Sequence, residues 1–199
     1  MFDTNIFPID SKPFGLSYTE WSIKWWQWIS SLPKDKNPAF DWSGERVNIT
    51  QYDSRVLFLC QTYESVESTP FRKNTIIRGT SIFMPIINWI SLMNYDGNTE
   101  EELRNIAKTR MDIIGPLEIT INGIKIRSGL EKYRINTPMF DIDLPGNNIF
   151  GLPSGKRFCI SDGYWIFLKP IHEDLKLSSY SSCSSGITKI KVNYDLKII

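Results

Sequence analysis

The sequence predicts a mainly β protein: an antiparallel β-sandwich, jelly-roll or immunoglobulin-like, with a tryptophan-rich N-terminal helix and one further short helix packed on it. Short runs rich in β-branched and aromatic residues alternate with turn signals along most of the chain, as in an all-β sandwich. Two other segments carry apolar residues at helical spacing behind a capping box. We expect one domain over residues 1–199, because the length suits one domain and no repeat of 20–50 residues appears.

The first helix is expected over residues 17–32, after an irregular arm over residues 1–16. Ser17 and Glu20 have the spacing of a capping box, in which the hydroxyl and the carboxylate satisfy free backbone N–H groups of the first turn. Pro33 ends the helix, because proline cannot continue its backbone hydrogen bonds. Both ends of this helix are therefore predicted by local signals.

Four of the seven tryptophans lie on or beside one apolar face of this helix. They are Trp21, Trp25, Trp26 and Trp28. A large aromatic ring can bury about 150–250 Å², so we interpret this face as part of the core. A helix lying on a membrane surface usually has a strongly basic polar face, whereas here Glu20 offsets Lys24. A ligand groove lined by one or two of the indoles is the remaining alternative.

Most of the other segments are predicted to be short strands. Apolar runs indicate strands at residues 55–62 and within residues 75–88, and Pro85 would place the latter at a sheet edge or a bulge. A second helix is expected over residues 99–113, where Thr99 and Glu102 repeat the capping-box pattern.

The C-terminal half contains several turn signals. Asn122-Gly123, between two alternating segments, predicts a hairpin. We also expect a tight turn at Asp162-Gly163 between two strands, and a mobile serine-rich loop at residues 178–186. Residues 187–199 alternate in polarity and predict a long final strand.

Charge and hydropathy exclude several function classes. The chain has 23 basic and 22 acidic residues, a formal net charge of +1, which argues against a general nucleic-acid-binding role. The longest uncharged run, residues 79–95, is interrupted by Pro85 and falls short of the roughly 20 apolar residues that a membrane-spanning helix needs. We therefore expect neither a nucleic-acid partner nor a transmembrane segment.

Cysteine and histidine usage predicts no cofactor or metal site. The three cysteines, Cys60, Cys159 and Cys183, are odd in number and widely spaced, unlike a disulfide framework. His172 is the only histidine, so the four Cys/His ligands of a structural zinc site are not expected. The start of the sequence lacks the pattern of a signal peptide, and together these features favour a cytoplasmic location.

The residues leave three functions open. The first is a non-catalytic binding or interaction module for a glycan or protein, with Trp42, Trp89 and Tyr164 as candidate ligand-binding aromatics. The second is a hydrolase with a carboxylate pair, for which the candidates are Asp141, Asp143 and Asp162. The third is a structural component of a larger assembly, which would expose an apolar patch. The aromatic content and the lack of catalytic motifs favour the first, and no oligomeric state is predicted.

Three segments resemble an uncharacterised microbial β-sandwich family. Residues 18–28 match its Y-T-E-W-x-x-K-W-W-Q-W signature and residues 162–170 match D-G-Y-W-x-x-L-K-P. Residues 79–88 are similar to a third segment, A-G-K-x-I-F-F-P-I-x-N. The resemblance implies a shared β-sandwich with the tryptophan helix packed against it, and it implies no activity.

The chain departs from that family in two places. Relatives often carry one cysteine before the V-x-F-L strand and another in an R-x-C-T segment, where this chain has residues 48–51 and 72–75 without cysteine. The resemblance therefore implies a disulfide lost as a pair, which fits a reducing compartment. Relatives also carry H-x-I-H-F-G-G after the L-K-P segment, where residues 171–175 hold only His172. A family site that used the histidine pair would be lost or altered here.

Overall fold

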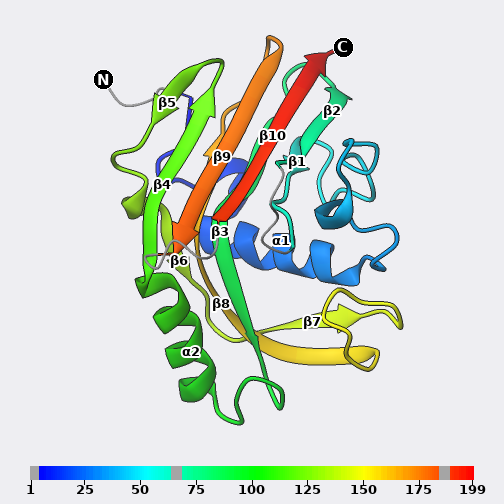
Figure 1. Ribbon diagram of the computed structural model, residues 1–199, viewed down its shortest axis with the longest axis vertical. Helices are drawn as coiled ribbons and strands as arrows, with labels where there is room; N and C mark the ends of the chain where they lie inside the picture. The colour runs from blue at the N-terminus through cyan, green and yellow to red at the C-terminus, as the bar shows by residue number, and fades with distance from the viewer. Residues whose placement is uncertain (1–4, 64–68, 184–188) are drawn as a thin grey trace.

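The computed structural model describes residues 5–63, 69–183 and 189–199, and its strands form two sheets (Figure 1). The first sheet has the order β1 (Val56–Phe58), β3 (Ser81–Leu92), β8 (Gly155–Leu168), β6 (Arg134–Asn136), and β7 (Phe140–Leu144) also pairs with β8. The second sheet has the order β2 (Phe71–Ile76), β10 (Lys189–Ile198), β9 (Leu175–Cys183), β4 (Ile114–Ile121), β5 (Ile124–Ile126). The predicted mainly β, sandwich-like fold is confirmed.

Two strand pairs differ from a purely antiparallel sandwich. Strand β1 pairs with β3 in parallel, and β2 pairs with β10 in parallel. A parallel pair needs a crossover connection. Strand β2, which belongs to the other sheet, lies between β1 and β3 in the chain, so the chain crosses between the sheets before it returns. Both sheets are therefore mixed.

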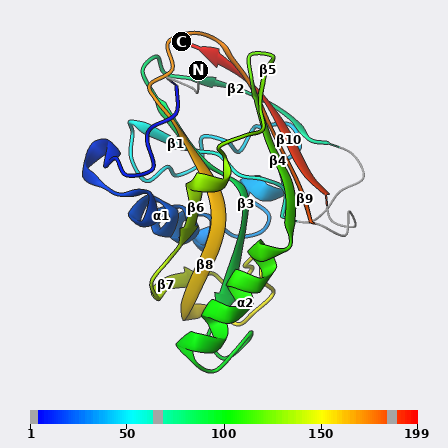
Figure 2. The same cartoon turned by 90° about the vertical axis from the view of Figure 1, so that its left-hand side faces the viewer.

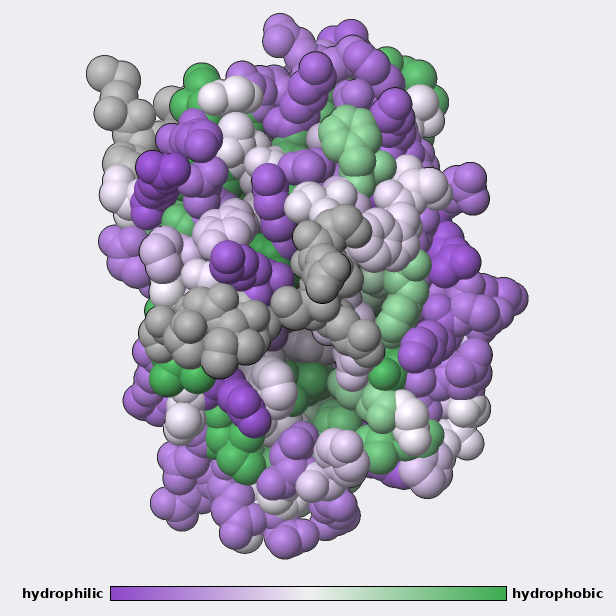
Figure 3. Space-filling model, in the orientation of Figure 1, coloured by the Kyte–Doolittle hydropathy of each residue, from purple (hydrophilic) through white to green (hydrophobic). Residues whose placement is uncertain are grey.

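The molecule is layered around the first sheet (Figure 2). Helix α1 (Tyr18–Ser31) covers one face of this sheet, while the second sheet and helix α2 (Glu100–Asp112) lie on the other side. Three 3₁₀ helices complete the elements: Pro13–Gly15, Pro38–Phe40 and Glu131–Tyr133. In the described part of the chain, neither long helix is long and apolar enough to cross a membrane. Hydrophilic residues cover much of the face shown in Figure 3.

Both long helices begin at the predicted capping boxes. In α1, the Glu20 amide donates to Ser17 Oγ at 3.3 Å, and the Ser17 amide donates to Glu20 Oε2 at 2.7 Å. In α2, Thr99 and Glu102 exchange the equivalent pair of bonds. Each box satisfies backbone donors that the first turn leaves free, so the predicted helix bounds hold to within one residue.

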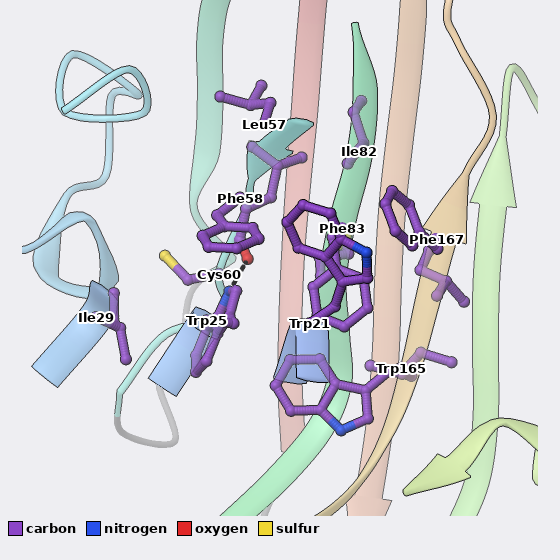
Figure 4. Close-up of a cluster of buried hydrophobic side chains, with 14 of the residues drawn as sticks. Trp21, Trp25, Ile29, Leu57, Phe58, Cys60, Ile82, Phe83, Trp165 and Phe167 are labelled. Atoms are coloured by element: carbon purple, nitrogen blue, oxygen red, sulfur yellow. Dashed lines mark hydrogen bonds between the residues drawn. The ribbon is translucent and has the colours of Figure 1, made fainter. Parts of the chain in front are cut away.

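The four tryptophans of α1 are buried, and Figure 4 shows Trp21 and Trp25 among the buried hydrophobic side chains of the core. The Trp25 indole packs edge-on against Trp165 of β8 at 5.2 Å between ring centroids, and Trp165 stacks on Phe83 of β3 at 5.1 Å. Each of the four indole N–H groups also has an acceptor. The acceptors are Pro13 O for Trp21, Leu59 O for Trp25, Ser161 Oγ for Trp26 and Ile49 O for Trp28. The interpretation of this face as core is confirmed.

Several local predictions are confirmed. The hairpin at Asn122-Gly123 joins β4 and β5, with positive φ at both residues (48° and 85°), as a type I′ turn requires. Pro85 lies at a bulge in β3, and the strand is at the sheet edge beyond its short pairing with β1. Proline is tolerated there because its missing donor costs no ladder bond.

Two local predictions are wrong. Asp162-Gly163 is not a turn, because β8 runs without interruption from Gly155 to Leu168. Gly163 serves instead for a close approach between strands: a Cβ there would lie 2.6 Å from Asn88 Cβ and 2.8 Å from its Cα. The serine-rich loop is also mostly strand, since β9 extends to Cys183. Ser179 and Ser181 are buried and continue the inward face of the strand that begins with Leu175 and Leu177. Residues 184–188 lie outside the described part.

We expect the substitution Gly163→Ala to destabilise the fold by about 1–3 kcal/mol, because the added methyl group would press on the backbone of β3. Gly146→Ala is the matched control, since a Cβ there meets no atom within 4 Å, and its effect should stay within about 0.5 kcal/mol. Urea denaturation measures both. Equal stability of the two variants would contradict the close-approach argument.

We expect Trp25→Phe to cost at least about 2 kcal/mol of unfolding free energy, because it removes core volume and the donor to the Leu59 carbonyl. Trp42→Phe is the control, since Trp42 is 48% exposed and should change stability by less than about 0.5 kcal/mol. Thermal or urea unfolding compares them. A neutral Trp25→Phe would show that the indole N–H does not help to hold α1 on the sheet.

Candidate functional site

The candidate site lies at the open edge of β3. Strand β1 pairs with β3 only at Ser81–Phe83, and beyond the bulge the described residues provide only β8 as a partner strand. An unpaired edge presents N–H and C=O groups that can pair with another chain, and proteins usually block such edges. Half of β3 therefore has one side with no partner strand among residues 5–63, 69–183 and 189–199.

The ladder shows which backbone groups point to that free side. Asn88 lies opposite Gly163 and Ile90 lies opposite Ser161. The Ser161 carbonyl accepts from the Thr137 amide at 2.9 Å, on the side of β8 away from β3. Backbone groups alternate in direction along a strand, so Asn88 and Ile90 direct their N–H and C=O groups away from β8.

Both ends of the free stretch are closed by side chains. At one end, Gln61 Nε2 donates to the carbonyls of Pro85 and Ile86 at 3.2 and 2.9 Å. At the other end, the Leu92 amide donates to Asp96 Oδ2 at 2.7 Å and the Leu92 carbonyl accepts from the Asp96 amide at 2.9 Å. We call Gln61 and Asp96 the two caps of this edge. Between them, the described part of the chain supplies no partner to the outward backbone groups of β3.

A pocket of about 520 Å³ lies along this edge. Its walls come from Trp25, Trp26 and Ile29 of α1, residues 60–63, residues 87–90 and Leu92 of β3, Tyr95, Asp96, Arg110 of α2, Ile149, Phe150, Ala39 and Ile190. In Figure 3, hydrophobic residues gather around a hollow in the lower centre of the face shown. The volume is within the range of small-ligand sites, about 300–1,000 Å³.

Four polar side-chain atoms in the pocket lining are buried and have no hydrogen-bond partner among the described residues. They are Gln61 Oε1, Thr62 Oγ1, Asn88 Nδ2 and Trp89 Nε1. Gln61 and Thr62 are only 6% and 8% exposed. An unsatisfied buried polar group costs about 1–3 kcal/mol, so four of them in one pocket require an explanation.

A buried arginine fixes the pocket segment at residues 59–62. Arg72 is fully buried, and its Nη1 donates to Cys60 O at 2.7 Å and to Tyr194 Oη at 2.6 Å. Tyr194 Oη in turn donates to Cys60 O at 2.7 Å. These bonds hold the backbone of Cys60 from two strands of the second sheet, which places the side chains of Gln61 and Thr62 at the pocket.

The ionisable side chains of the lining differ in whether they could interact with a ligand. The Asp96 carboxylate is engaged by the Leu92 amide. Arg110 is exposed and lies over the Trp89 ring at 4.7 Å from its centroid, and no carboxylate among the described residues pairs with it. Burial raises the pKa of the Cys60 thiol, so this cysteine is a neutral wall residue at pH 7 and not an activated nucleophile.

The structure brings only one of the three predicted ligand-binding aromatics to the pocket. Trp89 lines it, whereas Trp42 is exposed on the loop after Pro38–Phe40 and is not part of the lining. Tyr164 lies opposite Ile87 on β8, and its ring lies under the Arg134 guanidinium at 5.7 Å. The three rings do not form one surface.

Sequence reasoning missed Gln61, Thr62, Asn88 and Arg110. A signal for one of them was available: Pro85 marks an edge strand, so the residues that follow it were candidates for an open edge. The positions of the others depend on contacts between distant segments and have no local signature.

The three candidate catalytic carboxylates lie outside the pocket, and two of them already form ion pairs. Asp162 is 1% exposed and receives Arg134 Nε and Nη2 at 2.9 and 2.8 Å. Asp141 pairs with Lys156 at 3.1 Å, and Asp143 is exposed on β7. None of the three lines the pocket.

Within residues 5–63, 69–183 and 189–199, no cluster of three or more His, Cys, Asp or Glu residues is placed to hold a metal ion.

Comparison with known proteins identifies no family. No protein-family model and no curated protein sequence matches the chain. Among solved structures, the chain shows a likeness to one described as "Structure of PbICP-C in complex with falcipain-2", with 7% identity, a TM-score of 0.28, and coverage of 73% of this chain and 99% of that chain. A likeness this weak carries no argument about fold or function.

The geometry of the β3 edge predicts an alternating pattern of amide hydrogen exchange. The Ile87 and Trp89 amides lie in the ladder with β8, whereas those of Asn88 and Ile90 point to the free side. We expect the latter two amides to exchange at least about tenfold faster, because exchange follows local hydrogen bonding. Residue-resolved NMR exchange on the free protein measures this. Uniform protection from residue 87 to residue 90 would contradict an open edge.

Proposed function

We propose that this protein is a non-catalytic binding module whose ligand occupies the pocket at the open edge of β3. The observation that carries the proposal is the set of four unpartnered buried polar atoms that belong to residues of the pocket lining. A bound ligand would supply their missing hydrogen bonds, whereas an empty pocket leaves their desolvation uncompensated.

The composition of the pocket lining supports a binding site more than a catalytic site. Its walls combine indole and aliphatic side chains with a few convergent polar groups, which is the usual make-up of a ligand site. A general acid or base must be free to exchange a proton with substrate. The one acidic side chain of the lining, Asp96, already accepts the Leu92 amide, so the lining favours a binding module over the alternative of a carboxylate-dependent hydrolase.

The proposal predicts that the protein retains a ligand when the pocket is open and loses it when a larger side chain fills the pocket. We would present the immobilised protein to a glycan array and to a phage-displayed library of random eight-residue peptides. The comparison variant is Asn88→Trp, which fills the pocket with a side chain suited to a strand, and the matched control is Trp42→Ala, outside the pocket. The wild type and the control should retain ligands that Asn88→Trp does not.

Circular dichroism and thermal unfolding would first show that the filled variant is folded. If it is not, Thr62→Tyr provides a second way to occupy the pocket from another segment. The proposal fails if neither probe is retained by the wild type, or if every retained ligand binds the filled variants equally well.

A further inference from the structure

We infer that the ligand is an extended peptide segment of another protein, which adds as a strand to the free edge of β3 at Asn88 and Ile90. This inference rests on the proposed function and names the ligand class. The pocket does not merely lie near a strand: its lining includes the consecutive residues 87–90. An occupant therefore lies against backbone as well as against side chains.

The spacing of the free backbone groups matches that of a peptide strand. Asn88 and Ile90 are two residues apart, which corresponds to about 6.6–6.8 Å along a strand. A second strand presents its own N–H and C=O groups at the same interval, so it can satisfy both residues at once. The hydroxyl groups of a glycan could reach some of these atoms but would not repeat with this period.

The caps limit the length of the added strand. Gln61 occupies the carbonyls of Pro85 and Ile86, and Asp96 occupies both backbone groups of Leu92. The interval between these caps is about six residues, or roughly 20 Å of strand. The site therefore admits a short segment of about three to five paired residues and excludes a longer continuous ladder.

The two faces of the added strand would meet different surroundings. Ile90 and Asn88 lie on the same face as Ser161, whose hydroxyl accepts from Trp26 of α1. This side of the pocket is therefore mainly apolar and aromatic, with Asn88 as its polar side chain. Trp89 lies on the opposite face, beneath Arg110 of α2. Since strand side chains alternate between faces, a fitting peptide has apolar side chains toward α1.

The Arg110 guanidinium determines which kind of side chain the peptide would direct toward α2. Arg110 is exposed at the pocket and has no carboxylate partner among the described residues. A carboxylate on the peptide side chain that points toward α2 would pair with it, while the Trp89 ring fixes the guanidinium in place. The structure thus favours a segment in which an acidic residue lies next to apolar residues in the sequence.

The test uses one peptide from the phage-displayed library: the peptide whose enrichment on the wild-type protein most exceeds its enrichment on Asn88→Trp. Titration of this peptide into the isotope-labelled protein should protect the Asn88 and Ile90 amides from exchange by at least about tenfold, with little change at Ile87 and Trp89. An N-methyl scan of the peptide gives an independent readout without any protein variant. Methylation at alternate residues should weaken binding about tenfold or more, since each removes a ladder bond, and methylation at the residues between should be tolerated.

Two substitutions test the named contacts. Asn88→Pro removes one outward amide without removing a bond to β8 and should weaken the peptide about tenfold. Arg110→Glu should weaken an acid-containing peptide about tenfold or more. Lys132→Glu is its matched control, because Lys132 is also an exposed cation over an aromatic ring, Tyr133, but lies outside the pocket lining; it should leave affinity unchanged.

The outcomes separate this inference from the proposed function. Retention of glycans alone, or of a peptide that leaves the Asn88 and Ile90 amides unprotected, would overturn the strand-addition inference and leave the binding pocket intact. Protection of these amides through self-association, seen by light scattering without any peptide, would also overturn it. Absence of any pocket-dependent ligand would overturn both.

Discussion

The fold depends on one constraint: four indole N–H groups from a single helix must each find an acceptor inside the protein. A buried donor without a partner is costly, so α1 can occupy only a position where Pro13, Leu59, Ser161 and Ile49 all present oxygen atoms to it. Those acceptors belong to four different segments. The helix therefore both supplies apolar area and fixes where the arm, the end of β1, β8 and the loop before β1 lie.

The same constraint shapes the candidate site. The Trp25 bond to Leu59, together with the bonds of Arg72 and Tyr194 to Cys60, sets the path of the chain just before Gln61 and Thr62. That path leaves β1 after a short pairing with β3. The outer side of β3 is consequently left without a partner strand among the described residues, and the Gln61 side chain of the departing segment reaches it.

The site also shows how polar groups can be retained in a dense core. Elsewhere in the core, Arg72 and the indoles of α1 have partners, although five other buried polar atoms of the described residues, Trp165 Nε1 among them, have none; the remaining four belong to residues of the pocket lining. Evolution can remove such groups by substitution with apolar residues of similar size, at little cost to the fold. Their concentration at one edge is therefore more informative than the pocket volume alone.

The sequence by itself determined the features that depend on neighbouring residues. The capping boxes at Ser17 and Thr99, the type I′ hairpin at Asn122-Gly123 and the edge position of Pro85 all follow from local hydrogen bonding or from a fixed φ. Tertiary structure alone decided that Gly163 is a point of strand contact and not a turn, because glycine suits both roles and only the proximity of Asn88 distinguishes them. It likewise decided the site: Gln61, Asn88 and Arg110 come from three segments, and no local pattern specifies which segments meet when a chain crosses between two sheets.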